Sequence, residues 1–250
     1  MKNLKYFFPI CGIFVTLAIW ELLCLSGWVS HLLLPAPLTV FSSYMELWSK
    51  DYLLYNIFYS IKLNLLGYVQ AIVLAIPLGF VFGLVPSVKK LFNSQVTAVR
   101  FIPLTATIGL FIAWFGIEDM MKIQFLAFGI FVFLLPTVIQ RVSEVEQPYI
   151  DTAYTLGATK WQTICTVYFP SVISRVSDDI RVLVAISWTY LICAELVNKT
   201  GGLGALVYTC ARQSRIDKVF AILLLFVLLG IIQDRLFIIL DKLIFKHKYV

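Results

Sequence analysis

The chain of 250 residues has few charged side chains and almost no histidine. Asp, Glu, Lys and Arg together make up 14% of the residues, and there are two histidines. Soluble globular domains carry about 25% charged residues, so this chain lacks the polar side chains that would cover a soluble surface. Its high apolar content also excludes an intrinsically disordered chain. His31 and His247 are far apart and have no companion ligands, and no nucleophile lies beside a candidate base. We therefore expect neither a metal site nor a catalytic site in this chain.

The sequence also lacks disulfide, zinc and nucleotide-binding motifs. Its five cysteines show no C-x-x-C spacing, and most lie in or beside apolar segments. We interpret them as small apolar side chains in a helix bundle. No G-x-x-x-x-G-K-[ST] loop is present to hold nucleotide phosphates. The chain is therefore not expected to bind a cofactor or ATP.

Apolar residues dominate, at 60% of the chain. A helix needs about 20 of them to cross a hydrocarbon core of about 30 Å. Six stretches qualify or nearly qualify, at residues 7–25, 53–85, 101–115, 123–139, 182–197 and 219–240. The pattern predicts an all-α, polytopic membrane protein with about six transmembrane helices. The third and fourth stretches are short and contain Pro103 and Pro136, so we expect protein rather than lipid around them. Gly79 and Gly83 in the second stretch have the G-x-x-x-G spacing of a helix contact.

We expect one transmembrane domain over residues 1–250, with a first span at 1–30, an outer interfacial segment at 31–50 and a core at 51–250. The first span has no A-x-A cleavage site, so it should be retained. Lys and Arg favour the loops on the N-terminal side by ten to six, which predicts that both termini are cytoplasmic. Basic inner loops beside anionic lipid account for the net charge of +6 without nucleic acid. Residues 38–48 should form a helix on the outer membrane face.

The longest polar segment, residues 141–177, is then cytoplasmic. A predicted helix from Glu144 ends at Gly157, a residue suited to the left-handed turn that closes a helix. Thr159 and Gln162 have the spacing of a capping box, which predicts a second helix that ends near Pro170. Two short helices joined at a glycine form a compact elbow. The residues alone leave open whether this elbow enters a groove of another protein or lies on the membrane surface without a partner.

The elbow resembles the EAA loop of ABC importer permeases, whose pattern is E-A-A, three residues, G, nine residues, I, one residue, L-P. The matching positions are Asp151, Thr152, Ala153, Gly157, Val167, Phe169 and Pro170. Asp151, Thr152, Val167 and Phe169 depart from the pattern, although the spacing is kept at every step. Further segments follow the order seen in the nitrate, sulfonate, taurine and bicarbonate branch: Leu34-Pro35-Ala36-Pro37, Ile76-Pro77-Leu78-Gly79, Arg100-Phe101-Ile102-Pro103, Trp114-Phe115-Gly116-Ile117 and Gly202-Leu203-Gly204.

The resemblance implies a permease subunit in the bacterial cytoplasmic (inner) membrane that moves a small anion. It implies two permease chains, most simply a homodimer, two ABC ATPase subunits that hold ATP and Mg, and an extracytoplasmic substrate-binding protein. The elbow residues implied to dock on the ATPase are Asp151, Thr152, Ala153, Gly157, Ala158, Val167, Phe169 and Pro170. Open alternatives are an importer of an uncharged vitamin precursor, an ATPase-independent secondary transporter and an intramembrane enzyme.

Polar residues inside the predicted spans are candidates for a translocation path. They are Thr105, Thr107, Ser187, Trp188, Tyr190 and Glu195. The Ser and Thr hydroxyls could instead bond the backbone of their own helix. Glu195 could be an acid solvated from outside or paired with Lys199. Because a carboxylate is a poor ligand for an anion, we expect a gating or packing role for Glu195.

Overall fold

The computed structural model describes residues 4–197 and 199–249, and within these ranges the chain is all helix and turn without a strand. The elements are α1 (Leu4–Leu25), α2 (Pro37–Ser49), α3 (Leu53–Leu84), α4 (Pro86–Val99), the 3-10 helix η1 (Leu104–Thr107), α5 (Ile108–Phe115), α6 (Asp119–Ser143), α7 (Gln147–Thr155), α8 (Lys160–Thr163), the π-helical turn η2 (Ile164–Tyr168), α9 (Phe169–Val197), α10 (Leu203–Arg212), α11 (Ile216–Ile244) and the 3-10 helix η3 (Lys246–Tyr249). The predicted all-α class is confirmed, whereas the predicted count of about six spans is not.

Four helical rods in the described ranges are long and apolar enough to cross a membrane, namely α3, α6, the continuous segment from α8 to α9, and α11. The expected third span at 101–115 is not one helix. It is formed by α4 followed by η1 and α5, which are bent by 91° relative to each other. Pro103 lies at this break and has no N–H to continue a helix. The bent pair would make a fifth span, and the apolar part of α1, Cys11–Leu25, is shorter than a full span.

The core forms where α3 and α6 run side by side in the same direction. A Cβ atom built on Gly79 would lie 2.5 Å from Cγ1 of Val138, and one built on Gly83 would lie 2.6 Å from Cβ of Val142. Only glycine lets the two helix backbones approach this closely. The predicted G-x-x-x-G contact is therefore confirmed. The fourth span is not short as expected. It is the helix α6, which has 25 residues and continues past Pro136.

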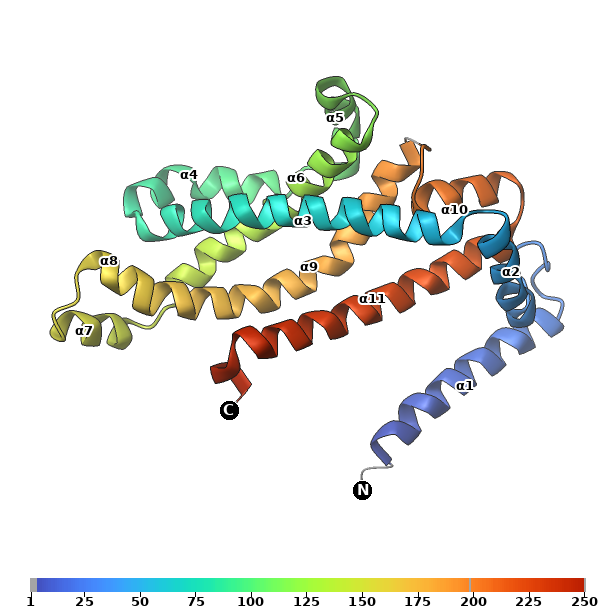
Figure 1. Ribbon diagram of the computed structural model, residues 1–250, viewed down its shortest axis with the longest axis horizontal. Coiled ribbons are helices and arrows are strands. Elements are labelled where there is room, and N and C mark those ends of the chain that lie inside the picture. The colour runs from blue at the N-terminus through green and yellow to red at the C-terminus, as the bar shows by residue number, and fades with distance from the viewer. Residues whose placement is uncertain (1–3, 198, 250) are drawn as a thin grey trace.

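The long helices α3 and α11 run roughly along the long axis of the molecule, whereas α2 and α5 stand across it (Figure 1). α7 and α8 lie at one end, and α2 and α10 lie at the other. α1 begins, and α11 ends, toward the elbow end. α1 leaves the bundle and is held near its outer end, where Trp20 Nε1 donates a hydrogen bond to the Pro35 carbonyl at 3.0 Å. α1 therefore begins, and α11 ends, on the elbow side of the molecule. The assignment of both termini to the cytoplasm stays a prediction.

The helix predicted at 38–48 is confirmed as α2, and its place on the outer membrane face stays a prediction. Val40 and Leu47 are buried against the bundle, and the Tyr44 hydroxyl donates to the Ala221 carbonyl of α11 at 2.7 Å. Phe41 and Met45 are exposed on the other face. α2 therefore packs on protein with one face and leaves an apolar face exposed.

Three of the six cations counted for the outer loops, Lys122, Arg212 and Lys218, lie instead within helices. Lys122 is fully buried in α6, and Lys218 is buried in α11, where its Nζ is 2.6 Å from Asp51 and 3.1 Å from Glu46. Lys218 thus pairs with acids from outside its own helix, whereas the acid nearest to Lys122 is Asp119 of the same helix, 4.0 Å away.

Candidate functional site

The elbow is a rigid turn between α7 and α8. Gly157 has φ of +84°, the left-handed conformation that glycine adopts without strain. The Ala158 N–H donates to the Ala153 carbonyl at 3.0 Å, and the Gly157 N–H donates to the Tyr154 carbonyl at 2.9 Å. These two bonds make a Schellman motif, which closes α7. Both the left-handed glycine and the end of the helix were predicted correctly.

The second arm of the elbow begins with the predicted capping box. Thr159 Oγ1 accepts from the Gln162 N–H at 3.3 Å, and Gln162 Oε1 accepts from the Thr159 N–H at 2.8 Å. The expected end at Pro170 is wrong, because the helix continues through it into α9. The Phe169 N–H bonds the Ile164 carbonyl five residues back, and this wider π turn makes room for a proline that lacks an N–H. The predicted loop 141–177 therefore contains the start of a long rod.

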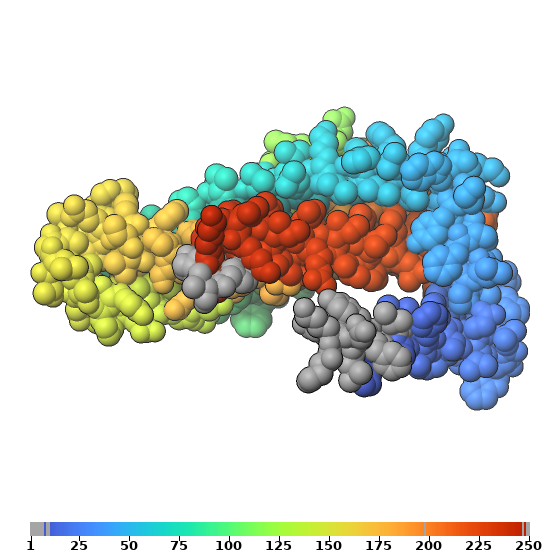
Figure 2. All heavy atoms as spheres, turned by 60° about the horizontal axis from the view of Figure 1, so that its bottom comes forward, coloured from blue at the N-terminus to red at the C-terminus, as the bar shows by residue number. Residues whose placement is uncertain are grey.

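Exposed side chains cover the elbow. Leu156 and Trp161 are 83% and 71% exposed, and Tyr154 is 47% exposed. Asp151 is exposed and accepts a hydrogen bond from Gln147 at 2.8 Å. Figure 2 shows the elbow as a knob that extends beyond the ends of the neighbouring helices. A protruding, apolar and internally bonded knob is suited to insertion into a groove of another protein.

An ionic cluster fixes the base of this knob. The Arg141 guanidinium bonds both carboxylate oxygens of Asp179 at 2.8 Å and Glu144 at 2.8 Å. The Arg141 hydrogen bond holds the pKa of Glu144 below its ordinary value. Bidentate arginine pairs fix geometry as well as charge. The cluster joins the end of α6 to α9, so the elbow is attached firmly to the bundle.

Of the eight residues predicted to dock on an ATPase, five lie in the elbow, Val167 lies in the π turn that follows it, and Phe169 and Pro170 open α9. Asp151, Thr152, Gly157 and Phe169 are exposed, and Ala153, Ala158 and Val167 are partly exposed. Phe169 also packs on Phe80 of α3, with ring centroids 5.8 Å apart. The docking role of these residues stays a prediction.

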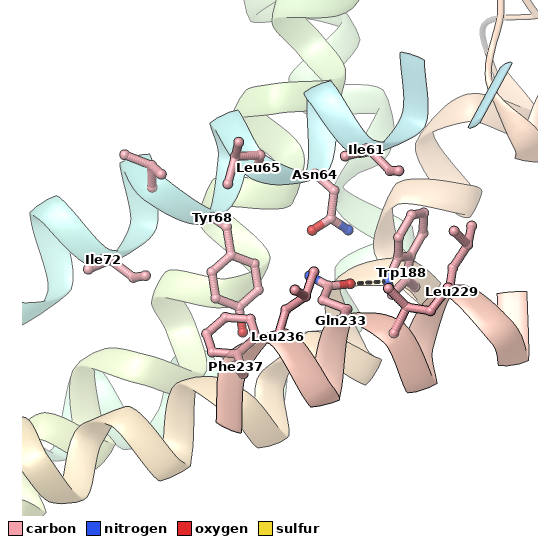
Figure 3. Close-up of a pocket in the computed structure, with 12 residues that line it drawn as sticks. Ile61, Asn64, Leu65, Tyr68, Ile72, Trp188, Leu229, Gln233, Leu236 and Phe237 are labelled. Carbon is pink, nitrogen blue, oxygen red and sulfur yellow. Dashed lines mark hydrogen bonds between the residues drawn. The ribbon is translucent and has the colours of Figure 1, made fainter. Parts of the chain in front are cut away.

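The six residues predicted to line a path lie in three separate places within the chain. Ser187 is fully buried, where its hydroxyl donates to the Val184 carbonyl at 2.7 Å and accepts from Asn64 at 3.1 Å. Trp188 Nε1 donates to Gln233 at 2.8 Å. Figure 3 shows this Trp–Gln pair and Asn64 in a cavity of about 260 Å³ between α3, α9 and α11. The partners Asn64 and Gln233 were missed, because single amides in apolar runs carry no spacing signal.

Thr105, Thr107 and Tyr190 lie around η1. Thr105 is exposed, whereas Thr107 bonds the Leu104 carbonyl of its own helix at 2.7 Å. Tyr190 packs against Phe125 of α6, with ring centroids 6.3 Å apart. Leu104 lies close to the same part of α6, since a Cβ atom built on Gly129 would contact both Leu104 and Tyr190. These three residues thus share one region, apart from Ser187 and Trp188.

Glu195 lies at the far end of α9 and is fully buried. Its oxygens accept from the Ser60 hydroxyl at 2.6 Å and from the Gly204 N–H at 2.7 Å, and the Ser60 oxygen accepts from the Leu203 N–H at 2.8 Å. The expectation of a solvated acid is therefore wrong. Lys199 lies over the ring of Tyr208 instead, at 3.9 Å from its centroid. Glu195 joins α3, α9 and the start of α10, and a gating or packing role stays a prediction.

Neighbouring polar groups extend this junction. Lys122 Nζ donates to the Tyr59 hydroxyl at 3.1 Å and to Thr200 at 3.2 Å, and the Tyr59 hydroxyl donates to Asp119. Asn56 accepts from the Gly202 N–H at 2.8 Å. Sequence reasoning missed these residues because each contact joins positions far apart in the chain. In the described ranges no group of His, Cys, Asp and Glu is arranged to hold a metal ion, and the five cysteines are free.

Comparison with known proteins assigns the chain. The sequence model of the family described as binding-protein-dependent transport system inner membrane component matches residues 71–246. The chain belongs to this family. It is therefore a multi-pass inner membrane component of an ABC transport system, and the resemblance drawn from the elbow motif is confirmed.

Relatives in the family refine the branch. The chain is 27% identical to the putative aliphatic sulfonates transport permease protein SsuC of Bacillus subtilis, over 94% of this chain and 85% of that protein. It is 27% identical to the taurine transport system permease protein TauC of Escherichia coli, over 83% of this chain and 77% of that protein. A putative ABC transporter permease of Methanocaldococcus jannaschii is 33% identical over 72% of this chain and 68% of its own length. The chain thus falls in the nitrate, sulfonate and taurine branch of the permeases.

Solved structures show the same fold. The inward-facing MetNI methionine ABC transporter superposes with a TM-score of 0.64 and 17% identity, over 76% of this chain and 94% of that chain. An amino acid ABC transporter with histidines gives a TM-score of 0.60 and 14% identity, over 81% of this chain and 96% of that chain. The helix arrangement is therefore that of an ABC transporter permease.

Proposed function

We propose that this chain is the permease subunit of an ATP-driven importer that moves a small anion, such as a sulfonate, taurine, nitrate or bicarbonate. A separate ATPase binds ATP and Mg and docks on the elbow at residues 151–170. The chain itself performs no catalysis. The sulfonate and taurine permeases among its relatives support the anion class.

The elbow is the observation that carries this proposal. Gly157 and the capping box at Thr159 hold two helices at a fixed angle, and Leu156 and Trp161 point outward from the turn. The apolar area of exposed Leu and Trp side chains favours burial by a partner. α8 is continuous with α9, so motion of a docked ATPase passes directly into a spanning helix.

Two further partners belong to this proposal. An extracytoplasmic binding protein delivers the solute at the end of the molecule that carries α2 and α10, as the description of the family supports. A second copy of the chain completes the path. Large apolar side chains on α3 and α11, including Leu65, Val73 and Ile232, are exposed and can be covered by this copy or by lipid.

Replacement of Gly157 by valine tests the docking assignment. A non-glycine residue in the left-handed region costs about 1–2 kcal/mol, and β-branching adds to this cost. We expect Gly157→Val to reach the membrane in normal amounts but to lose at least about tenfold in ATP-driven uptake and to retain less ATPase during purification. The assay is uptake of taurine, alkanesulfonates, nitrate and bicarbonate by proteoliposomes with the ATPase and the binding protein.

Gly230→Val is the matched control. Gly230 lies within α11, and a Cβ atom added there meets nothing within 4 Å. This variant should transport like the parent. Normal uptake by Gly157→Val would refute the docking role. Uptake without ATP would indicate a secondary transporter, and uptake of only uncharged vitamin precursors would overturn the anion class.

A further inference from the structure

α4 carries a stripe of exposed polar side chains that begins at Lys90 and ends at Arg100, the residue that follows the helix. Lys90, Asn93, Thr97 and Arg100 are all exposed and follow one another at intervals of three, four and three residues. This spacing places them on one face of a helix. α4 runs back along the inner part of α3 (Figure 1), where Phe92 stacks on Phe82 with ring centroids 5.5 Å apart. The polar stripe therefore lies along the bundle, in the half nearer the elbow.

Arg100 lies deep within the spanning region. Its guanidinium carbon is 5.8 Å from the centroid of the Phe133 ring. Phe133 is 14 residues after Asp119 and 10 residues before Ser143, the two ends of α6. At 1.5 Å per residue, these separations are about 21 Å and about 15 Å. The charge of Arg100 thus lies near the middle of α6, at a depth where an arginine facing lipid is very unfavourable.

Arg100 has no counter-charge within the described part of the chain. Its interaction there is with the Phe133 ring, and it forms no ion pair. Asp234, in the interior of α11, and Glu195, near the end of α9, are both already bonded. Asp234 accepts two bonds from Arg181 at 2.5 Å and 2.9 Å, and Glu195 accepts bonds from Ser60 and Gly204.

A second copy would not supply the missing charge. A two-fold axis along the membrane normal leaves depth unchanged, so a given residue lies at the same depth in both copies. Asp178, Asp179, Asp241 and Glu144 are paired with basic residues near the elbow end. The other acids lie at the opposite ends of the helices or in the elbow itself: Glu21, Glu46, Asp51, Glu118, Asp119, Glu146, Asp151 and Asp217. The partner of Arg100 must therefore come from outside the protein.

We propose that Arg100 is an anion-binding residue on the wall of the translocation path, at the break between α4 and η1. Water reaches it along the polar stripe of α4. This inference rests on the proposed transport function. The Arg100 guanidinium, at mid-depth, would favour anionic solutes such as sulfonates, nitrate and carboxylates.

Charge-selective labelling tests the proposal without knowledge of the solute. The full-length chain, with its five cysteines replaced by alanine, carries Thr105→Cys as a reporter in native membranes. The thiol is treated with methanethiosulfonate reagents that bear a sulfonate or a trimethylammonium group. We expect Thr105→Cys to react with both, and the sulfonate-to-ammonium rate ratio to fall about tenfold in Arg100→Gln. One unit charge about 10 Å away, at an effective dielectric constant of about 50, shifts the two rates in opposite directions by this combined factor.

Three controls make the result specific. Arg100→Lys should keep the ratio, because the charge is retained. Arg235→Gln removes an exposed arginine from α11 and should leave the ratio unchanged. Leu228→Cys on the exposed apolar face of α11, which lipid or the second copy covers, should react much more slowly. A neutral maleimide should react with Thr105→Cys at the same rate with and without Arg100, which separates loss of charge from loss of folding.

Two results would overturn the proposal. If Thr105→Cys reacts no faster than Leu228→Cys, the break faces lipid, and Arg100 then pairs with lipid phosphate rather than with solute. If Arg100→Gln leaves the ratio unchanged, Arg100 does not set the charge preference. Both results are independent of ATPase docking, so they leave the Gly157 experiment to decide the transport function.

Discussion

Replacement of Glu195 should cost the protein more stability than most single substitutions, because this side chain joins three elements. Glu195→Ala removes the acceptor of the Ser60 hydroxyl and of the Gly204 N–H, both of which are buried. Each buried donor left without an acceptor costs about 1–3 kcal/mol, so we expect a loss of about 2–6 kcal/mol before any cavity is counted. Glu195→Gln keeps one acceptor oxygen and the volume, and should lose about half as much.

The loss can be measured by equilibrium unfolding in mixed micelles, with the mole fraction of dodecyl sulfate as the denaturant axis. Thr189→Ala is the matched control on the same helix, because Thr189 is exposed and bonds only its own backbone; it should change stability by less than about 0.5 kcal/mol. Combining Glu195→Ala with Ser60→Ala should cost at least about 1 kcal/mol less than the sum of the two single losses. Equal stability of Glu195→Ala and the parent would refute the junction.

Two further predictions concern packing and pH. Gly79→Ala should destabilise the bundle by about 1–3 kcal/mol, because the added Cβ atom would clash with Val138. Gly109→Ala is the control: its added Cβ atom meets nothing within 4 Å, so its stability should be unchanged or higher. Thermal unfolding of the two variants in detergent compares them directly. Hydrogen bonds from Arg215 hold the pKa of Glu46 below its ordinary value, so the stabilisation from this pair is present at neutral pH and is lost as the pH falls through the folded-state pKa. Glu46→Gln should therefore show a smaller drop in melting temperature between pH 7 and pH 4, and an unchanged drop would contradict the assignment.

The elbow could be predicted from the sequence because its geometry is local. A left-handed glycine, a Schellman motif and a capping box each depend on residues within a few positions of one another, and Gly157 and Thr159 adopt the conformations expected of them. The long apolar spans were also predictable, since burial in lipid requires only length and composition.

The break before η1 and the rod through Pro170 were not predictable in the same way. α4 is too polar to be recognised as half of a span, and its place beside α3 depends on contacts such as Phe82 with Phe92. Pro170 normally ends a helix, and the π turn that accommodates it follows from packing on α3. Glu195, read as an interfacial acid, is buried because Ser60 and Gly204 reach it from distant parts of the chain.

The π turn has a mechanical consequence. Because it carries the helix past Pro170, the segment from Lys160 to Val197 is one rod of 38 residues. The ion pair of Asp179 with Arg141 holds this rod at an intermediate point, 19 residues from Lys160 and 16 residues from Glu195. These arms are about 28 Å and about 24 Å long at 1.5 Å per residue. If the rod pivots there as a stiff lever, a push of about 5 Å on the elbow swings Glu195 by about 4 Å in the opposite direction, which is longer than the hydrogen bonds that hold it.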